Sequence, residues 1–184
     1  MPHRGLKLLR NWIERYSLKS FVVTSNVDGQ FQKAGFAEEE ILEVHGSIDH
    51  LQCTVPCCDD IWGNDQKVDI ATLQAQCFPH CIHCRFVARP NILMFGDSSW
   101  LNARAVRQRR HFDRFLANVE LPLLVIEVGA GKAIPTIRHL SERLAHPDGN
   151  RLIRINPREA QVPERQISLA VGALEGLEQI EAAL

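Results

Sequence analysis

Apolar positions near the start of the chain recur with the spacing of an amphipathic helix. The residues with this spacing are Leu6, Leu9, Trp12, Ile13 and Tyr16. The run from Phe21 to Thr24 that follows is rich in β-branched residues and predicts a buried strand. Residues 28–35 fit a short helix closed by Gly35, and Ile41 to His45 fit a second, shorter extended segment. The first part of the chain therefore alternates helix and strand.

The same alternation returns in the second half of the chain. The pattern predicts a polar helix near Ala103–Asn118, an apolar strand over Leu123–Ile126, a helix near Thr136–Leu144, a strand over Leu152–Ile155 and a last helix from about Leu174. Strands rich in Val, Ile and Leu that alternate with helices are typical of parallel α/β sheets. We expect an α/β fold with a partial, Rossmann-like parallel sheet.

The segment from about residue 50 to 90 has a different composition. It contains all six cysteines, several Asp and Pro, and little periodicity. We interpret it as a small module that is inserted into the α/β domain and lacks a large core of its own.

Length, charge and cysteine usage narrow the class of protein. The chain has 184 residues, 45% of them apolar, and a formal net charge of −1, so neither nucleic acid nor an anionic membrane surface is expected as a partner. No apolar run approaches the roughly 20 residues that span a bilayer, and the first residues lack the apolar core of a secretory signal. We expect a cytoplasmic protein, in which clustered cysteines indicate metal binding or catalysis and not disulfides.

The cysteines form two close pairs, Cys53-x3-Cys57 and Cys81-x2-Cys84. Two such pairs joined by a loop bring four thiolates together in the tetrahedral arrangement that zinc prefers. Four protein ligands leave no open position, so the zinc ion is expected to be structural. The spacing leaves open whether Cys58 takes the place of Cys57. Three further donors lie nearby: Cys77, His80 and His83.

Polar residues follow the first predicted strand. Asn26 and Asp28 come directly after it, at the edge where open parallel sheets bind ligands. Residues of these types also cap helices, and the spacing alone does not choose between the two roles. His45 ends the next extended segment. It is either a structural histidine or, because its ordinary pKa lies near neutrality, a general base.

A second group of candidates follows the later strands. The segment from Glu127 to Lys132 comes between a strand and a helix, where backbone N–H groups can face a phosphate. It lacks the spacing of a P-loop and the third glycine of a dinucleotide fingerprint. Asn156 ends the next strand and is either a ligand-binding residue or a turn residue before Pro157.

Taken in order, these segments resemble the sirtuins, the NAD-dependent protein deacylases of the Sir2 family. Thr24–Gly29 is similar to T-Q-N-[IV]-D-G, Glu43–Ser47 to E-x-H-G-[ST], and Arg89–Asp97 to R-P-x-[IV]-V-x-F-G-E. The two cysteine pairs lie between the second and third of these motifs. Gly129–Gly131, Ile155-Asn156 and Val171–Ala173 follow where the family has G-T-S, I-N and a segment near the adenine site.

The resemblance implies that the chain is a sirtuin-type catalytic domain over residues 1–184, with NAD as cosubstrate, structural zinc and acylated lysines of proteins as substrates. It makes His45 the catalytic base. In the family's reaction the acyl oxygen attacks the nicotinamide ribose, nicotinamide leaves, and the products are free lysine and O-acyl-ADP-ribose. It assigns NAD contacts to Ser25, Asn26, Asp28, Gly129, Gly131, Asn156 and Ala173. It also assigns substrate contacts to Phe95, Gly96 and Asp97, as a strand that pairs with the substrate backbone.

One feature of the family is not found in the sequence. The initial strand with its glycine-rich G-A-G-x-S loop, which cradles the NAD pyrophosphate, does not precede Thr24. We therefore expect an N-terminally incomplete domain, with unpaired strand edges at Phe21 and Leu123 that favour self-association. Two alternative functions follow: a catalytically impaired, zinc-stabilised binding module, and NAD-dependent ADP-ribosyl transfer or NAD hydrolysis.

Overall fold

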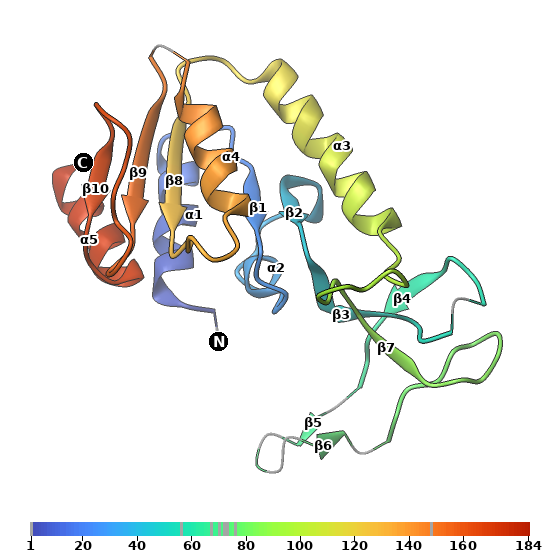
Figure 1. Ribbon diagram of the computed structural model, residues 1–184. Helices are drawn as coiled ribbons and strands as arrows, with labels where there is room; N and C mark the ends of the chain where they lie inside the picture. The colour runs from blue at the N-terminus through green and yellow to red at the C-terminus, as the bar shows by residue number, and fades with distance from the viewer. Residues whose placement is uncertain are drawn as a thin grey trace. The chain divides into compact units, whose positions relative to one another are not determined.

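The computed structural model describes residues 2–55, 57–66, 68–69, 71, 74–75, 77–147 and 149–184 (Figure 1). The chain forms two compact units. One consists of residues 1–20 and 115–184, and the other of residues 21–114.

The first unit is a parallel sheet with helices on both faces. Its elements are α1 (Arg4–Arg15), β8 (Leu124–Val128), α4 (Thr136–Ala145), β9 (Arg151–Ile155), β10 (Ile167–Leu169) and α5 (Ala173–Ala183). The strand order is β10-β9-β8, all parallel. Helix α4 covers one face of this sheet, and α1 and α5 cover the other (Figure 1).

Side chains along β9 point alternately to the two faces of the sheet, and the two faces differ in chemistry. Ile153 and Ile155 point to one face, where they form a buried cluster with Trp12 of α1 and Leu177 of α5. Because successive side chains of a strand point to opposite faces, Arg154 points to the α4 side. The apolar cluster therefore fixes α1 and α5 on one face, and a buried charge lies on the other.

Arg154 is fully buried and is held by two carboxylates. Its Nε lies 2.5 Å from Oε1 of Glu127, its partner across the β8–β9 ladder, and its Nη2 lies 2.9 Å from Oε2 of the same residue. Nη2 also donates to Glu142 of α4 at 2.9 Å. A bidentate arrangement of this kind compensates for the loss of hydration of both charges.

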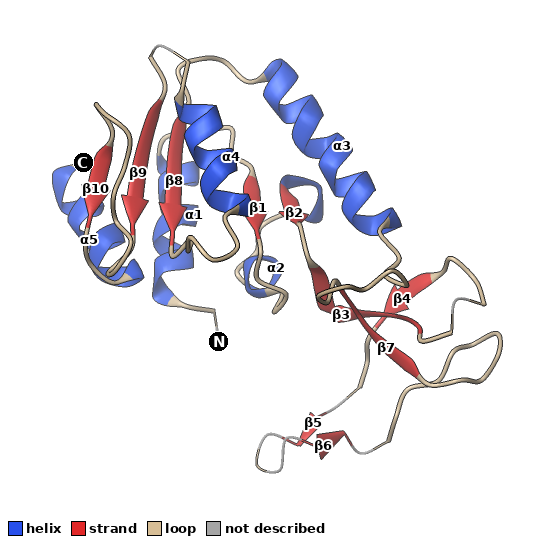
Figure 2. Ribbon diagram, in the orientation of Figure 1, coloured by secondary structure: helices blue, strands red, loops and turns tan. Residues whose placement is uncertain are grey.

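The second unit contains short strands and a long helix. Its elements are β1 (Val22–Thr24), α2 (Gln30–Lys33), the 3-10 helix η1 (Glu38–Glu40), β2 (Ile41–Glu43), β3 (Gly46–Cys53), β4 (Ile61–Gly63), β5 (Val68–Asp69), β6 (Gln74–Ala75), β7 (Ala88–Ile92) and most of α3 (Ala103–Asn118). Strands β1 and β2 are parallel, and the remaining pairs, β4-β3-β7 and β5-β6, are antiparallel (Figure 2).

A buried polar contact joins β3 and β7. The side chain of Asn91 donates to Oε1 of Gln52 at 2.8 Å and to the carbonyl of Leu101 at 2.9 Å. Gln52 in turn donates to the carbonyl of Ser99 at 2.8 Å. Both amide side chains are almost completely buried, and both find partners, as buried polar groups must. This contact ties the loop after β7 to the three-stranded sheet.

The structure confirms the α/β class, the parallel sheets and the predicted helices. It corrects the expectation that the strand near Phe21 is buried. All three residues of β1 are half-buried, because β1 pairs only with β2 among the described residues. Leu124, at the start of β8, is 59% exposed, and β8 likewise pairs only with β9 in the described part of the chain.

The Arg154–Glu127 pair gives a prediction about stability. Replacing Glu127 with Leu leaves the buried Arg154 charge with one carboxylate, that of the partly exposed Glu142. The free energy of unfolding should therefore fall by about 3–5 kcal/mol. The double variant Glu127→Leu/Arg154→Met removes both charges and should recover most of this loss. Urea unfolding monitored by circular dichroism measures both values. Equal losses in the single and double variants would contradict the assignment of the cost to an unpaired charge.

Candidate functional site

Four cysteine side chains meet in the second unit. The sulfur atoms of Cys53, Cys57, Cys81 and Cys84 all lie within 4.8 Å of one another. The Sγ–Sγ distance is 3.5 Å for Cys53 and Cys84, and 3.5 Å for Cys57 and Cys81. Cys53 ends β3, whereas Cys81 and Cys84 flank a tight turn that precedes β7. The group therefore joins the end of one strand to the approach of its neighbour.

The spacing of these sulfur atoms fits zinc. A tetrahedral zinc ion with bonds of about 2.3 Å to each thiolate places its sulfur ligands about 3.8 Å apart, slightly more than the distances here. Cys53 and Cys81 are almost completely buried, which keeps water away from the site. The four-cysteine group includes Cys57 and not Cys58, the choice that the spacing had left open. The cluster can bind a zinc ion, with no ligand position left for chemistry.

Backbone donors prepare one of these thiols for a metal ion. The N–H of Cys84 lowers the pKa of the Cys81 thiol to about 6, against the opposing effect of burial, and the N–H of His83 adds to the lowering. Burial raises the pKa of Cys53, and contact with neighbouring thiols, first that of Cys84, raises the pKa of Cys57. A bound cation reverses these increases because it stabilises all four thiolates.

The residues after β1 form a loop at the carboxyl end of that strand. Ser25 and Asn26 are exposed, and the backbone N–H of Asn26 donates to Oγ1 of Thr24 at 3.0 Å. Oδ1 of Asp28 accepts from the backbone N–H of Gln30 at 3.3 Å, at the start of α2. Gly29 is the N-cap of α2, and no side chain caps this helix, so neither Asn26 nor Asp28 has the capping role that the sequence allowed. Asp28 instead forms a local turn contact, and Asn26 is exposed.

The backbone of His45, which follows β2, is hydrogen-bonded to the residue that follows β7. Its carbonyl accepts from the N–H of Leu93 at 2.9 Å, and its side chain is half-buried. The next residue, Gly46, has φ +80, and a Cβ atom there would lie 1.9 Å from the carbonyl oxygen of Asn91. Only glycine allows this close approach, so the Gly46 position fixes where His45 lies.

A buried ionic group that the sequence did not reveal lies beside this segment. Nη1 of Arg104 on α3 is 2.5 Å from Oε2 of Glu43, and the same guanidinium contacts Glu38. Oε1 of Gln108, one turn further along α3, accepts from the backbone N–H of Glu43 at 3.0 Å. Arg104 and Gln108 therefore anchor α3 against the strand that leads to His45. Their only sequence signal is the polar pattern of the helix.

His50, on β3, lies close enough to Arg104, Glu38 and Glu43 to feel their charges. Burial lowers the pKa of His50 below its usual 6.5, and the positive charge of Arg104 lowers it further. Its buried Nδ1 atom has no hydrogen-bond partner among the described residues. The folded chain therefore favours the neutral imidazole.

Phe95, Gly96 and Asp97 do not form the strand that the sequence predicted. β7 ends at Ile92, and the N–H of Asp97 donates to the carbonyl of Met94 at 3.2 Å in a turn with Gly96 at φ +68. Phe95 is 91% exposed. The Asp97 carboxylate accepts from Nη2 of Arg89 at 2.7 Å and from the Ser99 hydroxyl at 2.9 Å. These bonds hold the pKa of Asp97 below its usual value, although burial alone would raise it, and they bend the segment away from an extended form.

The first unit brings three of the predicted NAD-contacting residues together. Gly129, with φ +70, follows β8, and its N–H donates to the carbonyl of Ile155 at 2.9 Å. Nδ2 of the buried Asn156 donates at 3.1 Å to the carbonyl of Ala130, which lies between Gly129 and Gly131. Asn156 therefore shapes the loop between the two glycines. Ala173, the fourth predicted residue in this unit, is exposed at the first position of α5.

The turn role that the sequence allowed for Asn156 is also present. Its Oδ1 accepts from the backbone N–H groups of Arg158 and Glu159, at 3.0 and 2.9 Å. Sequence reasoning missed Arg138 of α4, which is buried and donates to the carbonyls of Glu159 and Gln161 at 2.9 and 2.7 Å. An arginine in an amphipathic helix that also carries Arg143 gives no signal of such a role.

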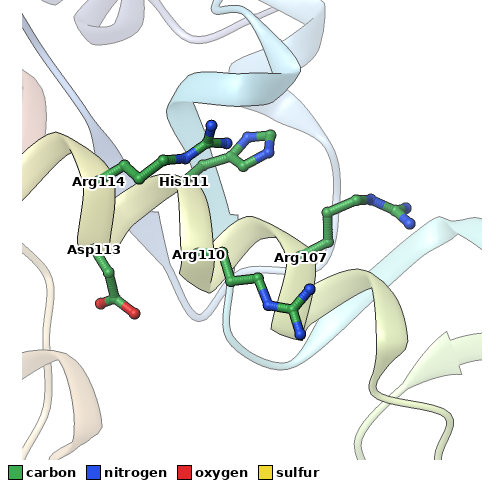
Figure 3. A pocket seen from close by; sticks show the side chains of 5 residues that line it. All are labelled: Arg107, Arg110, His111, Asp113 and Arg114. Atoms are coloured by element: carbon green, nitrogen blue, oxygen red, sulfur yellow. The ribbon is translucent and has the colours of Figure 1, made fainter.

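A hollow of about 470 Å³ lies on α3, and none of the predicted site residues lines it. It is lined by Arg107, Arg110, His111, Asp113 and Arg114, which project from successive turns of the helix (Figure 3). All five belong to one helix, so the hollow is a charged helix surface and not an enclosed site.

Comparison with known proteins identifies the family. The model of the Sir2 family matches residues 1–119. The chain belongs to the Sir2 family. An NAD-dependent protein deacylase of Aquifex aeolicus is 28% identical over 163 residues, which cover 88% of this chain and 59% of the relative. A Fusarium oxysporum protein described as a probable bifunctional ADP-ribose hydrolase/ADP-ribosyltransferase is 28% identical over 87% of this chain and 30% of its own length.

Solved sirtuin structures have the same fold as this Sir2-family chain. A structure from work on sirtuin substrate affinity has a TM-score of 0.69 and 21% identity, with 99% of this chain and 68% of that one covered. A Sir2 homologue in complex with NAD has a TM-score of 0.65 and 23% identity, with 100% and 66% covered. The chain thus spans about three fifths of the Aquifex relative.

No helix in the described part of the chain is long and apolar enough to cross a bilayer.

The four-cysteine group predicts a strict dependence on zinc. In Cys81→Ser the buried ligand is lost, so the Sir2-family chain should lose its tightly bound zinc, and the segment between Cys53 and Ala88 should become sensitive to protease. Zinc content by mass spectrometry and limited proteolysis measure these effects. Cys77→Ser changes an exposed cysteine outside the group and serves as the control. Full zinc content in Cys81→Ser would contradict the ligand assignment.

His50 predicts a pH dependence of stability. Because its pKa is lower in the folded chain, the unfolded chain binds more protons below about pH 6.5, so the free energy of unfolding should fall as the pH drops through that range. Replacement of His50 with Leu should flatten this decline in urea unfolding between pH 7 and 5. His139→Leu, at an exposed position on α4, should keep the full slope. An equal slope in wild type and His50→Leu would rule out His50 as the source.

Proposed function

We propose that this Sir2-family chain is an NAD-dependent protein-lysine deacylase, with His45 as the catalytic base. The observation that carries the proposal is the position of His45 at the carboxyl end of β2, where the close approach of Gly46 to Asn91 fixes its backbone. A half-buried histidine whose backbone is fixed next to a strand end is a residue of the type that most often serves as a general base. The names of several relatives, including the deacylase of Aquifex aeolicus, point to the same activity.

In the proposed reaction the acyl oxygen of an acyl-lysine attacks the nicotinamide ribose of NAD, and nicotinamide leaves. His45 then accepts the proton of a ribose hydroxyl as that hydroxyl attacks the acyl carbon. The bond between the acyl carbon and the lysine nitrogen breaks, and the lysine leaves as a free amine. Water then adds to the acyl carbon, which is bound to two ribose oxygens at that stage. Release of the first of these oxygens leaves the acyl group on the hydroxyl that attacked, as O-acyl-ADP-ribose.

Two sets of residues are proposed for contacts with NAD. In the second unit they are Ser25, Asn26 and Asp28, and in the first they are Gly129, Gly131, Asn156 and Ala173. The exposed Asn26 side chain and the loop with Gly129 at positive φ support this assignment, since both present polar groups without bulky side chains. Asp28 and Asn156 already hydrogen-bond within the chain, so their proposed role is to hold these loops in shape as well as to meet the ligand.

The proposed protein partner is an acylated lysine side chain with its flanking backbone. Phe95, Gly96 and Asp97 remain the proposed substrate-contacting residues. In this proposal the exposed Phe95 ring meets the substrate, while Asp97 holds the turn through Arg89. The cytoplasmic location, the inserted module over residues 50–90 and self-association through the edges of β1 and β8 stay predictions.

A second function is ADP-ribosyl transfer or NAD hydrolysis at the same residues. The name of the Fusarium relative favours it. In this alternative nicotinamide still leaves, but water or another nucleophile takes the ribose in place of the acyl oxygen. A third possible function is that of a zinc-stabilised binding module without catalytic activity.

An acyl-peptide assay with NAD separates these functions. Release of free lysine, followed by mass spectrometry, should fall about 10²–10⁴-fold in His45→Ala, the range for loss of a general base, and should be unchanged in His139→Ala. Nicotinamide release without deacylation would support ADP-ribosyl transfer or hydrolysis instead. Absence of NAD binding by calorimetry at millimolar concentration would overturn both enzymatic proposals.

A further inference from the structure

A second group of metal-ligating side chains lies next to the four cysteines. It consists of the Cys58 thiol, an Asp60 carboxylate oxygen and a ring nitrogen of His83, all within 4.8 Å of one another. Nε2 of His83 lies 2.5 Å from Oδ2 of Asp60. Thiolate, imidazole and carboxylate are the three protein ligand types of zinc.

The two groups are adjacent, because Cys57 of the first and Cys58 of the second are neighbours in the sequence. Cys57 Sγ lies 3.7 Å from Cys58 Sγ, close to the distance of about 3.8 Å between two sulfur ligands of one tetrahedral zinc ion. Cys57 Sγ is also 3.5 Å from Cys81 Sγ. Cys57 Sγ therefore contacts a thiol of each group, although it is not one of the three donors of the second group.

The first group holds the second in place. Cys58 follows Cys57 directly, and His83 lies in the turn between Cys81 and Cys84. When zinc fixes the four cysteines, it also fixes the backbone on both sides of the second group. Its donors then need little further ordering to meet a cation, which lowers the entropy cost of binding.

Electrostatics favour a cation at this position. Four thiolates around one divalent zinc ion leave a net negative charge, and Asp60 adds another. The side chains of Asp60 and His83 are 58% and 48% exposed, so a metal ion can reach them from solvent. A site that is open on one side binds and releases its ion more readily than the closed four-cysteine site.

We propose that Cys58, Asp60 and His83 bind a second, exchangeable divalent cation of the zinc class. Binding displaces the thiol proton of Cys58 and leaves the His83 ring neutral, with one nitrogen on the metal. The site lies outside the residues proposed for acyl transfer. Its position beside Cys57 suits the uptake of zinc and its passage to the four-cysteine site.

Metal stoichiometry tests the proposal on the full reduced chain. Wild type is dialysed against buffered free zinc at saturation, and bound zinc per chain is measured by mass spectrometry. We expect a second zinc ion in wild type and its loss in Cys58→Ser, Asp60→Asn and His83→Gln, each of which keeps the first. Cys77→Ser and His80→Gln alter other donors of the same module and should keep both ions.

Cobalt gives an independent readout that does not depend on activity. In wild type the thiolate-to-cobalt charge-transfer absorption should keep rising beyond the first equivalent, because Cys58 adds a new Co–S bond. In Cys58→Ser it should stop there. Retention of the first ion and of the circular dichroism spectrum shows that a variant is folded. A single zinc ion in saturated wild type, or a second ion that survives both Cys58→Ser and His83→Gln, would overturn the proposal.

Discussion

Four sulfur atoms from two distant segments meet within 4.8 Å in the second unit, and much of that unit depends on their contact. They join the end of β3 to the turn before β7. These two strands also carry the hydrogen bond between the side chains of Gln52 and Asn91. Asn91 is also the residue against which Gly46 packs, and the N–H of Leu93 binds the His45 carbonyl. A metal ion at the cysteines thus stabilises the strand pair that fixes His45, although it takes no part in the proposed reaction.

Elements with a clear period could be predicted from the sequence. The spacing of apolar residues in α1 and α4 and the apolar runs of β8 and β9 gave the α/β class. The cysteine pairs gave the four-sulfur group because metal ligation imposes its own spacing. Asp28 and Asn156 show why the rest was harder. Each was open to a structural or a binding role, and the structure shows both making local hydrogen bonds that residue type alone does not reveal.

Long-range polar contacts could not be predicted. Arg154 lies in an apolar strand next to the ladder partner Glu127, and Arg104 reaches Glu43 from a helix sixty residues later in the chain. Such pairs depend on register and helix orientation, which short windows of sequence do not encode. The segment at Phe95 was predicted as a strand because of its resemblance to a family motif. Its turn results from Gly96 at positive φ and from the Asp97–Arg89 pair, which is tertiary.

We propose that Cys53, Cys57, Cys81 and Cys84 hold one zinc ion on which the framework around His45 depends. X-ray absorption at the zinc edge of His83→Gln, in which only the four-cysteine site is complete, tests this ligand set. We expect a first shell of sulfur alone, with four sulfur atoms at about 2.3 Å. A nitrogen or oxygen ligand in that shell, or fewer than four sulfur atoms, would contradict it.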